Sequence, residues 1–143
     1  MSRLPRVTIA RVLHWAGTHD IATAWEDGAV TLDPEGRAVL VHALTDQVMV
    51  LRTTEEVETD NLPVEDLADA IRQSDTQLWS TRAVLQSREP LPRTPMTVDV
   101  TVNVAAGLSD VQLDTALCDA LRALQEGRMR TTRAISTIVE ERR

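Results

Sequence analysis

Residues 96–104 alternate between apolar and polar side chains without a break. The apolar positions are Met96, Val98, Val100, Val102 and Val104. Successive side chains of a strand point to opposite faces of a sheet, so this pattern predicts a strand with one apolar face. β-Branched valine also suits a pleated surface that packs against another element.

The segment that follows has the pattern of a capped amphipathic helix. Ser109 and Gln112 are spaced as a capping box, in which each side chain bonds the backbone N–H of the other residue. Four leucines then recur at helical spacing: Leu113, Leu117, Leu121 and Leu124. We predict a helix through residue 125 that stops near Gly127, with its apolar stripe buried against the alternating strand.

The N-terminal half predicts one helix and then short strands. Residues 4–16 place apolar side chains at helical spacing, and Gly17 supplies a stop. Residues 22–25 and 29–32 indicate a short hairpin or one bent strand. A turn at residues 33–36 follows, since proline and glycine lie together there.

Two apolar segments come next. Residues 38–44 are almost entirely apolar and predict a central strand. Residues 47–53 are apolar on both faces, with Met49 and Leu51 among them, so this strand is either central or covered by a partner. Residues 54–61 are acidic and are predicted to form a connection.

Further along the chain we predict a helix from Pro63 to residue 79, a strand at 80–86 and a stiff proline-rich loop at 87–95. The element order is therefore α-β-β-β(-β)-α-β-β-α. Strands joined by short turns pair antiparallel, which predicts an α+β fold with a mainly antiparallel sheet of five to six strands and helices on one face.

The length of 143 residues suits one domain, which we place at residues 1–127. Residues 128–143 are expected to form a basic amphipathic tail, either docked on the domain or used for self-association. No apolar run reaches the ~18 residues that span a bilayer, so no membrane association is expected. A single cysteine fits a reducing compartment, and we predict a cytoplasmic protein.

Charge and aromatic content argue against nucleic-acid binding. The net charge is −7, the sequence has no phenylalanine or tyrosine, and all 15 basic residues are arginine. Nucleic-acid binding surfaces usually show a basic stripe with stacking aromatic side chains. The charge is uneven, with basic ends and an acidic belt in the middle: Glu55, Glu56, Glu58, Asp60, Glu65, Asp66 and Asp69.

The histidines and the cysteine form no recognisable metal motif. The candidate set is His14, His19, His42 and Cys118. His14 and His19 are five residues apart, which does not place both on one helix face, and no CxxC or HxxxH spacing occurs. We therefore predict no metal and no cofactor. We expect Cys118 to be a buried or half-buried thiol and His42 to be a hydrogen-bonded strand residue.

Catalytic motifs are also missing from the sequence. The adjacent carboxylates lie at 26–27, 55–56 and 65–66, in a predicted turn, a connection and a helix start, where acidic residues have ordinary structural roles. Acid–base catalysis needs two carboxylates in one cleft, and no glycine-rich phosphate loop or G-x-S-x-G pattern occurs. We predict that the protein is not an enzyme.

The second half resembles the YbjN domain family, which has the fold of type III secretion chaperones. The likeness rests on the helix that runs into Trp79, the strands at 80–86 and 96–104, and the segment Gly107-Leu108-Ser109-Asp110-Val111-Gln112-Leu113 before the last helix. It extends over roughly residues 5–125. The resemblance implies no catalytic residues. It implies a small, acidic, cytoplasmic homodimer that holds partner segments without ATP.

Together these features favour a protein-binding module that forms a homodimer and binds an unidentified protein partner. The residues expected to contact a partner are Trp79, Met49, Leu51, Arg82 and Asp99. Arg82 and Asp99 lie on adjacent predicted strands, where they form either an exposed cross-strand pair or a polar binding face. The alternative function is a small-ligand sensor or an enzyme with a pocket between sheet and helices.

Overall fold

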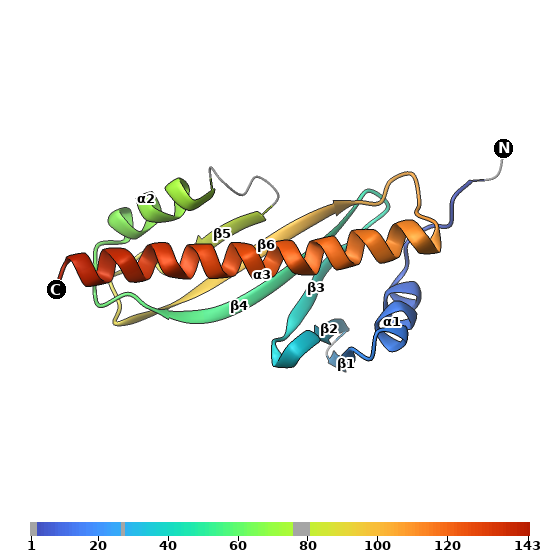
Figure 1. The fold of residues 1–143 in the computed structure, drawn as a ribbon, viewed down its shortest axis with the longest axis horizontal. Helices are drawn as coiled ribbons and strands as arrows, with labels where there is room; N and C mark the ends of the chain where they lie inside the picture. The colour runs from blue at the N-terminus through green and yellow to red at the C-terminus, as the bar shows by residue number, and fades with distance from the viewer. Residues whose placement is uncertain (1–2, 27, 76–80) are drawn as a thin grey trace. The chain divides into compact units, whose positions relative to one another are not determined.

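The computed structural model describes residues 3–26, 28–75 and 81–143, and it has an α+β fold (Figure 1). The elements in chain order are α1 Ile9–Thr18, β1 Ala22–Glu26, β2 Ala29–Asp33, a 3₁₀ turn Pro34–Gly36, β3 Val39–Leu44, β4 Val48–Glu58, α2 Val64–Asp75, β5 Thr81–Leu85, β6 Arg93–Asn103 and α3 Asp110–Glu141. The strands form one antiparallel sheet in the order β1-β2-β3-β4-β6-β5. The predicted element order and fold class are confirmed.

The chain divides into two compact units. Unit 1 comprises residues 1–53 and 100–122, and unit 2 comprises residues 54–99 and 123–143. β4, β6 and α3 each contribute residues to both units. Whether residues 1–127 fold without residues 128–143 stays a prediction.

In unit 1, β1 and β2 form the hairpin that the sequence allowed, and β3 and β4 continue it. Trp25 pairs with Val30, Val30 with Val41, and Val41 with Leu51, so these side chains share one face of the sheet. Val30, Val41 and Leu51 are buried. This face forms the sheet side of the unit 1 core.

The helical side of the unit 1 core comes from α1 and the start of α3. The buried side chains include Val12, Trp15, Leu113 and Leu117. The predicted capping box is confirmed: Gln112 N–H donates to Ser109 Oγ at 3.1 Å, and Ser109 N–H donates to Gln112 Oε1 at 2.9 Å. The box fixes where α3 begins, because it satisfies two backbone donors that have no partner within the helix.

In unit 2, arginines of α3 pair with the acidic belt. Arg128 lies 3.4 Å from Glu55, and both side chains are less than one-fifth exposed. Thr132 Oγ1 also donates to Glu55, at 2.8 Å. Near the C-terminus the pairs are Arg142–Asp66 at 3.0 Å and Arg143–Glu58 at 2.8 Å. Residues 128–141 therefore continue α3, and the two C-terminal arginines pair with acidic residues of the same unit.

Two predicted boundaries of the long elements were wrong. The last helix does not stop at Gly127 but continues to Glu141. Gly127 instead allows close packing, because a Cβ there would lie 2.7 Å from Thr81 Oγ1. A mid-helix glycine costs only about 1 kcal/mol. β4 extends through Glu58 where a connection was expected. Val57 is buried there, and α3 supplies partners for Glu55.

Smaller differences occur at three other ends. α1 begins at Ile9, not residue 4, because Thr8 caps it by accepting the Arg11 backbone N–H. The helix also passes Gly17 and ends at Thr18. β6 begins at Arg93, inside the predicted loop, and Pro95 O accepts the Gln86 backbone N–H. Proline lacks only a donor, so its carbonyl can still serve a neighbouring chain.

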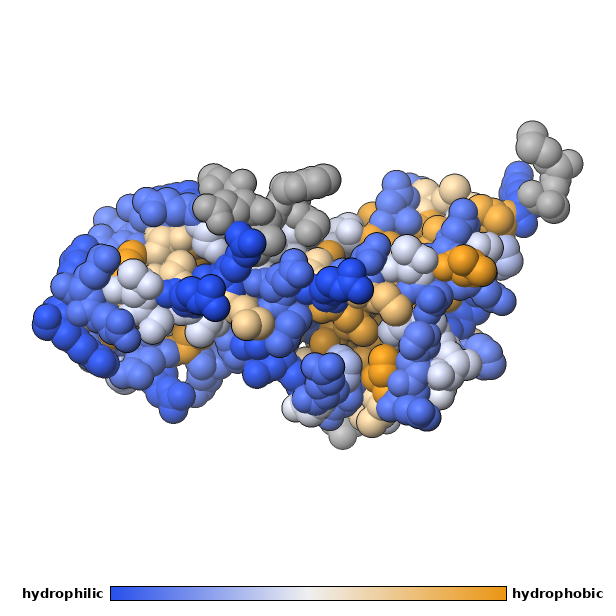
Figure 2. All heavy atoms as spheres, in the orientation of Figure 1, coloured by the Kyte–Doolittle hydropathy of each residue, from blue (hydrophilic) through white to orange (hydrophobic). Residues whose placement is uncertain are grey.

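Most of the visible surface in Figure 2 is hydrophilic, with apolar side chains in small patches. Among the described residues, the large apolar side chains with the greatest exposure are Leu4, Trp25, Val111 and Met129. No helix in the described ranges is both long enough and apolar enough to cross a membrane.

Candidate functional site

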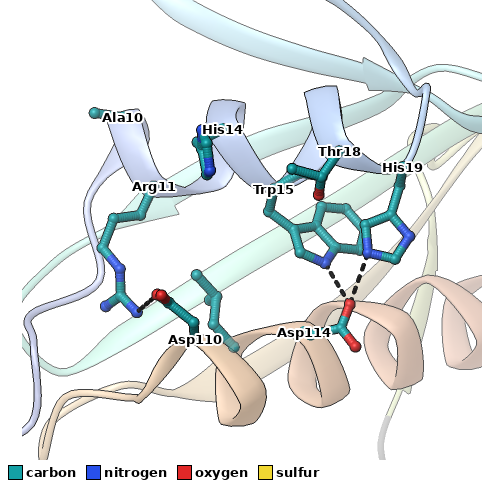
Figure 3. Close-up of a pocket in the computed structure, with 9 residues that line it drawn as sticks. Ala10, Arg11, His14, Trp15, Thr18, His19, Asp110 and Asp114 are labelled. Atoms are coloured by element: carbon teal, nitrogen blue, oxygen red, sulfur yellow. Dashed lines mark hydrogen bonds and ion pairs between the residues drawn. The ribbon is translucent and has the colours of Figure 1, made fainter.

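A half-open groove of about 530 Å³ runs between α1 and the start of α3 in unit 1 (Figure 3). Both walls combine apolar and polar side chains, and the polar side chains on the α3 side are acidic. The lining residues used below are Arg11, His14, Trp15, His19, Asp110 and Asp114. The sequence predicted no such groove, because α1 and α3 are about a hundred residues apart in the chain.

Three side chains converge on one carboxylate oxygen, Asp114 Oδ1. The Trp15 indole N–H donates to it at 2.8 Å, and His19 Nε2 lies 2.7 Å away (Figure 3). The Cys118 thiol approaches the same oxygen at 3.8 Å. The rings of Trp15 and His19 lie 4.6 Å apart between centroids. Helix α3 places Asp114 and Cys118 one turn apart on a common face.

The convergence shifts the acidity of both α3 groups. The Trp15 hydrogen bond, helped by His19, lowers the pKa of the Asp114 carboxyl. Burial raises the pKa of the Cys118 thiol, and the neighbouring charge of Asp114 raises it further. Cys118 is half-buried, as the sequence predicted. At neutral pH the thiol is therefore protonated and the carboxylate is ionised.

At the other end of the groove, Arg11 fixes the start of α3. Its guanidinium donates to the Leu108 carbonyl at 2.7 Å and to Asp110 at 3.1 Å, and it also donates to the Pro5 and Arg6 carbonyls. The Arg11 side chain is only 19% exposed. These contacts occupy its donors, so Arg11 has a structural role at the groove wall.

A second exposed feature of unit 1 is the edge strand β1. β2 is its only neighbour in the sheet order, and the residues from Ala22 to Trp25 are uncharged. Trp25 is 59% exposed although it shares a face with buried Val30 and Val41. An edge strand presents unpaired backbone donors and acceptors along its outer side.

The residues predicted to contact a partner lie in different environments. Met49 and Leu51 are completely buried, so they belong to the core of the chain and have no surface to offer a partner. Arg82 is exposed on β5, and Asp99 is half-buried on β6, the neighbouring strand. Trp79 lies outside the described residues. His42 is exposed on β3.

Sequence reasoning missed Asp114 altogether and separated His19 from Cys118. The local signal was the four-residue spacing between Asp114 and Cys118, which a helix places on one face. Nothing local indicates that His19, 95 residues from Asp114, meets them. His14 and His42, considered with them at first, do not belong to the cluster: His14 lines the groove and His42 is exposed on β3.

Comparison with known proteins gives structural relatives but no sequence relatives. No family model matches the chain, and no curated protein sequence is similar to it. The crystal structure of YbjN from E. coli, proposed to be a transcription regulator, superposes with a TM-score of 0.70 over 94% of this chain and 96% of that one. The chain has the YbjN fold.

A second structure with this likeness is an uncharacterised protein from Methanothermobacter thermautotrophicus. Its TM-score is 0.56, over 87% of this chain and 96% of that chain. The sequence identities are 14% to YbjN and 16% to the second protein. At such identities the likeness establishes the YbjN fold and carries no activity with it.

Proposed function

We propose that the chain is a non-enzymatic, cytoplasmic protein-binding module that takes an extended segment of a partner protein as an added strand on β1, without ATP. The observation that carries the proposal is the edge position of β1 combined with the exposed Trp25. In strand addition, main-chain hydrogen bonds supply affinity and alternate side chains supply specificity.

β1 has few of the features that usually protect a sheet edge. Charged side chains, proline and β-bulges commonly prevent edge strands from pairing with other chains. Glu26, at the end of β1, is its one charged residue, residues 22–25 are uncharged and contain no proline, and the pairing with β2 runs without a shift from Ala22 to Glu26. The strand is therefore regular and open to a further strand on its outer side.

Trp25 gives such a partner an apolar anchor. Its side chain projects from the face that carries the core, at the point where that face reaches the sheet edge. Tryptophan is enriched among the residues that dominate binding energy at protein interfaces. We expect the added segment to be extended and uncharged opposite β1, with an apolar side chain that covers Trp25.

The test is site-specific photocrosslinking of the full chain in cells. A photoreactive phenylalanine at position 23, on the same face as Trp25, should crosslink to one contiguous segment of one partner, identified by mass spectrometry. Trp25→Ala should lower the yield about tenfold, because loss of an interface anchor costs roughly 1.4 kcal/mol or more. Thr23 is exposed, so the probe itself should not disturb the core.

Position 111 provides the matched control, since Val111 is 78% exposed on α3 of the same unit. The same probe there should give no specific product. Similar products from positions 23 and 111, or a yield that Trp25→Ala leaves unchanged, would overturn the proposal. Crosslinks from position 23 to a second copy of the chain would replace the partner by self-association.

A second candidate function is small-ligand binding in the groove between α1 and α3. The groove has a volume of about 530 Å³, which is in the size range of many ligand pockets, and two helices contribute polar groups to it. A thermal-shift screen of small polar metabolites would test this function. A ligand of the groove should lose its effect in His14→Gln, whereas Trp25→Ala should bind it normally.

A further inference from the structure

We propose that His19, Asp114 and Cys118 form a binding site for a divalent transition-metal ion of the zinc class. Their potential ligand atoms all lie within 4.8 Å of one another. All three residues belong to unit 1. This inference does not rest on the proposed function, because β1 and Trp25 take no part in the site.

Two helices place the three ligands. Asp114 and Cys118 are four residues apart on α3 and therefore project from one face. His19 directly follows α1, and its backbone N–H is held by the Trp15 carbonyl at 3.2 Å. A pair of ligands one turn apart, completed by a third from another element, is a common way to build a zinc site.

The donor set selects the class of ion. Imidazole nitrogen, carboxylate oxygen and thiolate sulfur together suit zinc and similar first-row ions. Magnesium and calcium prefer oxygen ligands alone, and only one of the three residues offers oxygen. Three protein ligands would leave a fourth position for water or a further ligand. Two of the three, His19 and Asp114, line the groove.

Charge favours a cation at this point. The Cys118 sulfur lies 3.8 Å from the Asp114 carboxylate, so a cation there would face one acidic group directly. The neighbouring arginines have other partners: Arg11 pairs with Asp110, and Arg122 lies 3.7 Å from Asp119. On binding, the thiol proton passes to solvent and the sulfur–metal bond forms, so the dication neutralises the carboxylate and the new thiolate.

The distances require only small side-chain movements. Zinc–ligand bonds of about 2.0–2.3 Å place tetrahedral ligand atoms roughly 3.3–3.7 Å apart. The sulfur of Cys118 is 3.8 Å from Asp114 Oδ1, whereas His19 Nε2 is 2.7 Å from it and must move out by roughly half an ångström. The His19 and Asp114 side chains are 40% and 49% exposed, so they can move without disturbing the core.

Trp15 acts as a positioning residue for this site. Its indole N–H donates to Asp114 Oδ1, and the Trp15 ring is itself buried at 6% exposure. A hydrogen bond of this kind holds a ligating carboxylate in one orientation, and loss of such outer contacts typically weakens metal binding about 10- to 100-fold. The buried Trp15 indole therefore orients the Asp114 carboxylate, which His19 and Cys118 approach.

The experiment is a cobalt titration of the full chain without a histidine tag, under reducing conditions. Co²⁺ stands in for zinc because it gives absorption bands that zinc lacks. We expect one equivalent to bind with a sulfur-to-cobalt charge-transfer band and zinc to displace it. Cys118→Ser should abolish that band, and His19→Gln should weaken binding about tenfold or more.

His42→Gln is the matched control, since His42 is exposed on β3 and lies outside the cluster. It should bind cobalt like the parent chain. X-ray absorption of the zinc-loaded parent chain should show one sulfur and otherwise nitrogen or oxygen ligands, which keeps the test independent of variant folding. No stoichiometric binding, or a charge-transfer band that survives Cys118→Ser, would overturn the assignment and leave a hydrogen-bonded contact between α1 and α3.

Discussion

The two units satisfy the carboxylates near α3 in different ways. In unit 2 the partners of Glu55, Glu58 and Asp66 are guanidinium groups, each of which carries a permanent charge. Unit 1 also has guanidinium pairs, such as Arg11–Asp110, but its Asp114 has an indole, an imidazole and a thiol, none of which carries a permanent positive charge. Asp114 is therefore the acid that differs from those of unit 2, and it belongs to the proposed metal site.

The start of α3 differs from its end in backbone packing as well. Leu108 N–H donates to the Pro5 carbonyl at 2.9 Å, and Gly107 has a positive φ of 74° at the same place. A Cβ on Gly107 would lie 2.4 Å from the Leu4 carbonyl oxygen. The start of α3 is therefore held by close backbone contact in addition to Arg11, whereas the contacts described at its end are side-chain ion pairs.

The largest effect should come from Gly107→Ala. Left-handed backbone strain and a clash with backbone atoms together should lower the free energy of unfolding by roughly 2–4 kcal/mol. Urea denaturation followed by circular dichroism measures the loss. Gly36→Ala is the control, since Gly36 has φ 77° but open space around it, and it should cost only about 1–2 kcal/mol. Equal losses would show that the close contact at Gly107 contributes nothing.

The next effect concerns the Arg128–Glu55 ion pair of unit 2, which is largely buried. Arg128→Met should lower the free energy of unfolding by about 2 kcal/mol, because it removes a guanidinium from beside a carboxylate that is only 19% exposed. Arg122→Met on the same helix removes a pair whose side chains are 70% and 65% exposed, and it should cost under ~0.5 kcal/mol. Similar losses in the same denaturation assay would contradict the role assigned to Glu55.

A smaller effect is expected at the capping box of α3. Ser109→Ala should cost about 1 kcal/mol, since a backbone N–H loses its acceptor. Hydrogen exchange should accelerate at the first turn of α3 more than elsewhere. Thr115→Ala removes a hydroxyl from an exposed position inside the same helix and should be neutral or slightly stabilising. An equal loss in both variants would mean that the cap adds no stability.

The smallest effect should be at the end of α3. Arg142→Gln removes a pair with Asp66 in which the arginine is 53% exposed, and it should change the free energy of unfolding by under ~0.5 kcal/mol. Raising the salt concentration should shrink even this difference, because screening acts most on exposed charges. A loss as large as that of Arg128→Met would remove the distinction between buried and exposed pairs in unit 2.

Local patterns predicted the local structure well. Alternation predicted β6, and the Ser109–Gln112 spacing predicted the start of α3, because both depend on residues a few positions apart. The wrong boundaries are those that depend on contacts between residues far apart in the sequence. β4 passes through acidic residues because Arg128 and Thr132 meet Glu55 across more than seventy positions. Gly127 lies inside α3, where it leaves space for Thr81, a contact 46 positions away that no local pattern indicates.

The candidate site was beyond sequence reasoning for the same reason. The contact of His19 with Asp114 depends on how α1 packs on α3. Met49 and Leu51 were predicted to contact a partner but are buried within the chain. The sequence pattern of an apolar strand is the same whether a partner or the chain's own helices cover it. The residues that best fit a binding surface are those at an exposed edge, and edge position follows from strand order.

The placement of the tryptophans has a practical consequence. With no tyrosine in the chain, intrinsic fluorescence comes from tryptophan alone. Trp15 is buried against an imidazole, whereas Trp25 is open to solvent. The emission maximum of Trp25 should shift to shorter wavelength when an added strand covers the side chain. The emission intensity of Trp15 should change when an ion binds beside it at His19 and Asp114. Variants that keep only Trp25 or only Trp15 would therefore report strand binding and ion binding separately, by fluorescence.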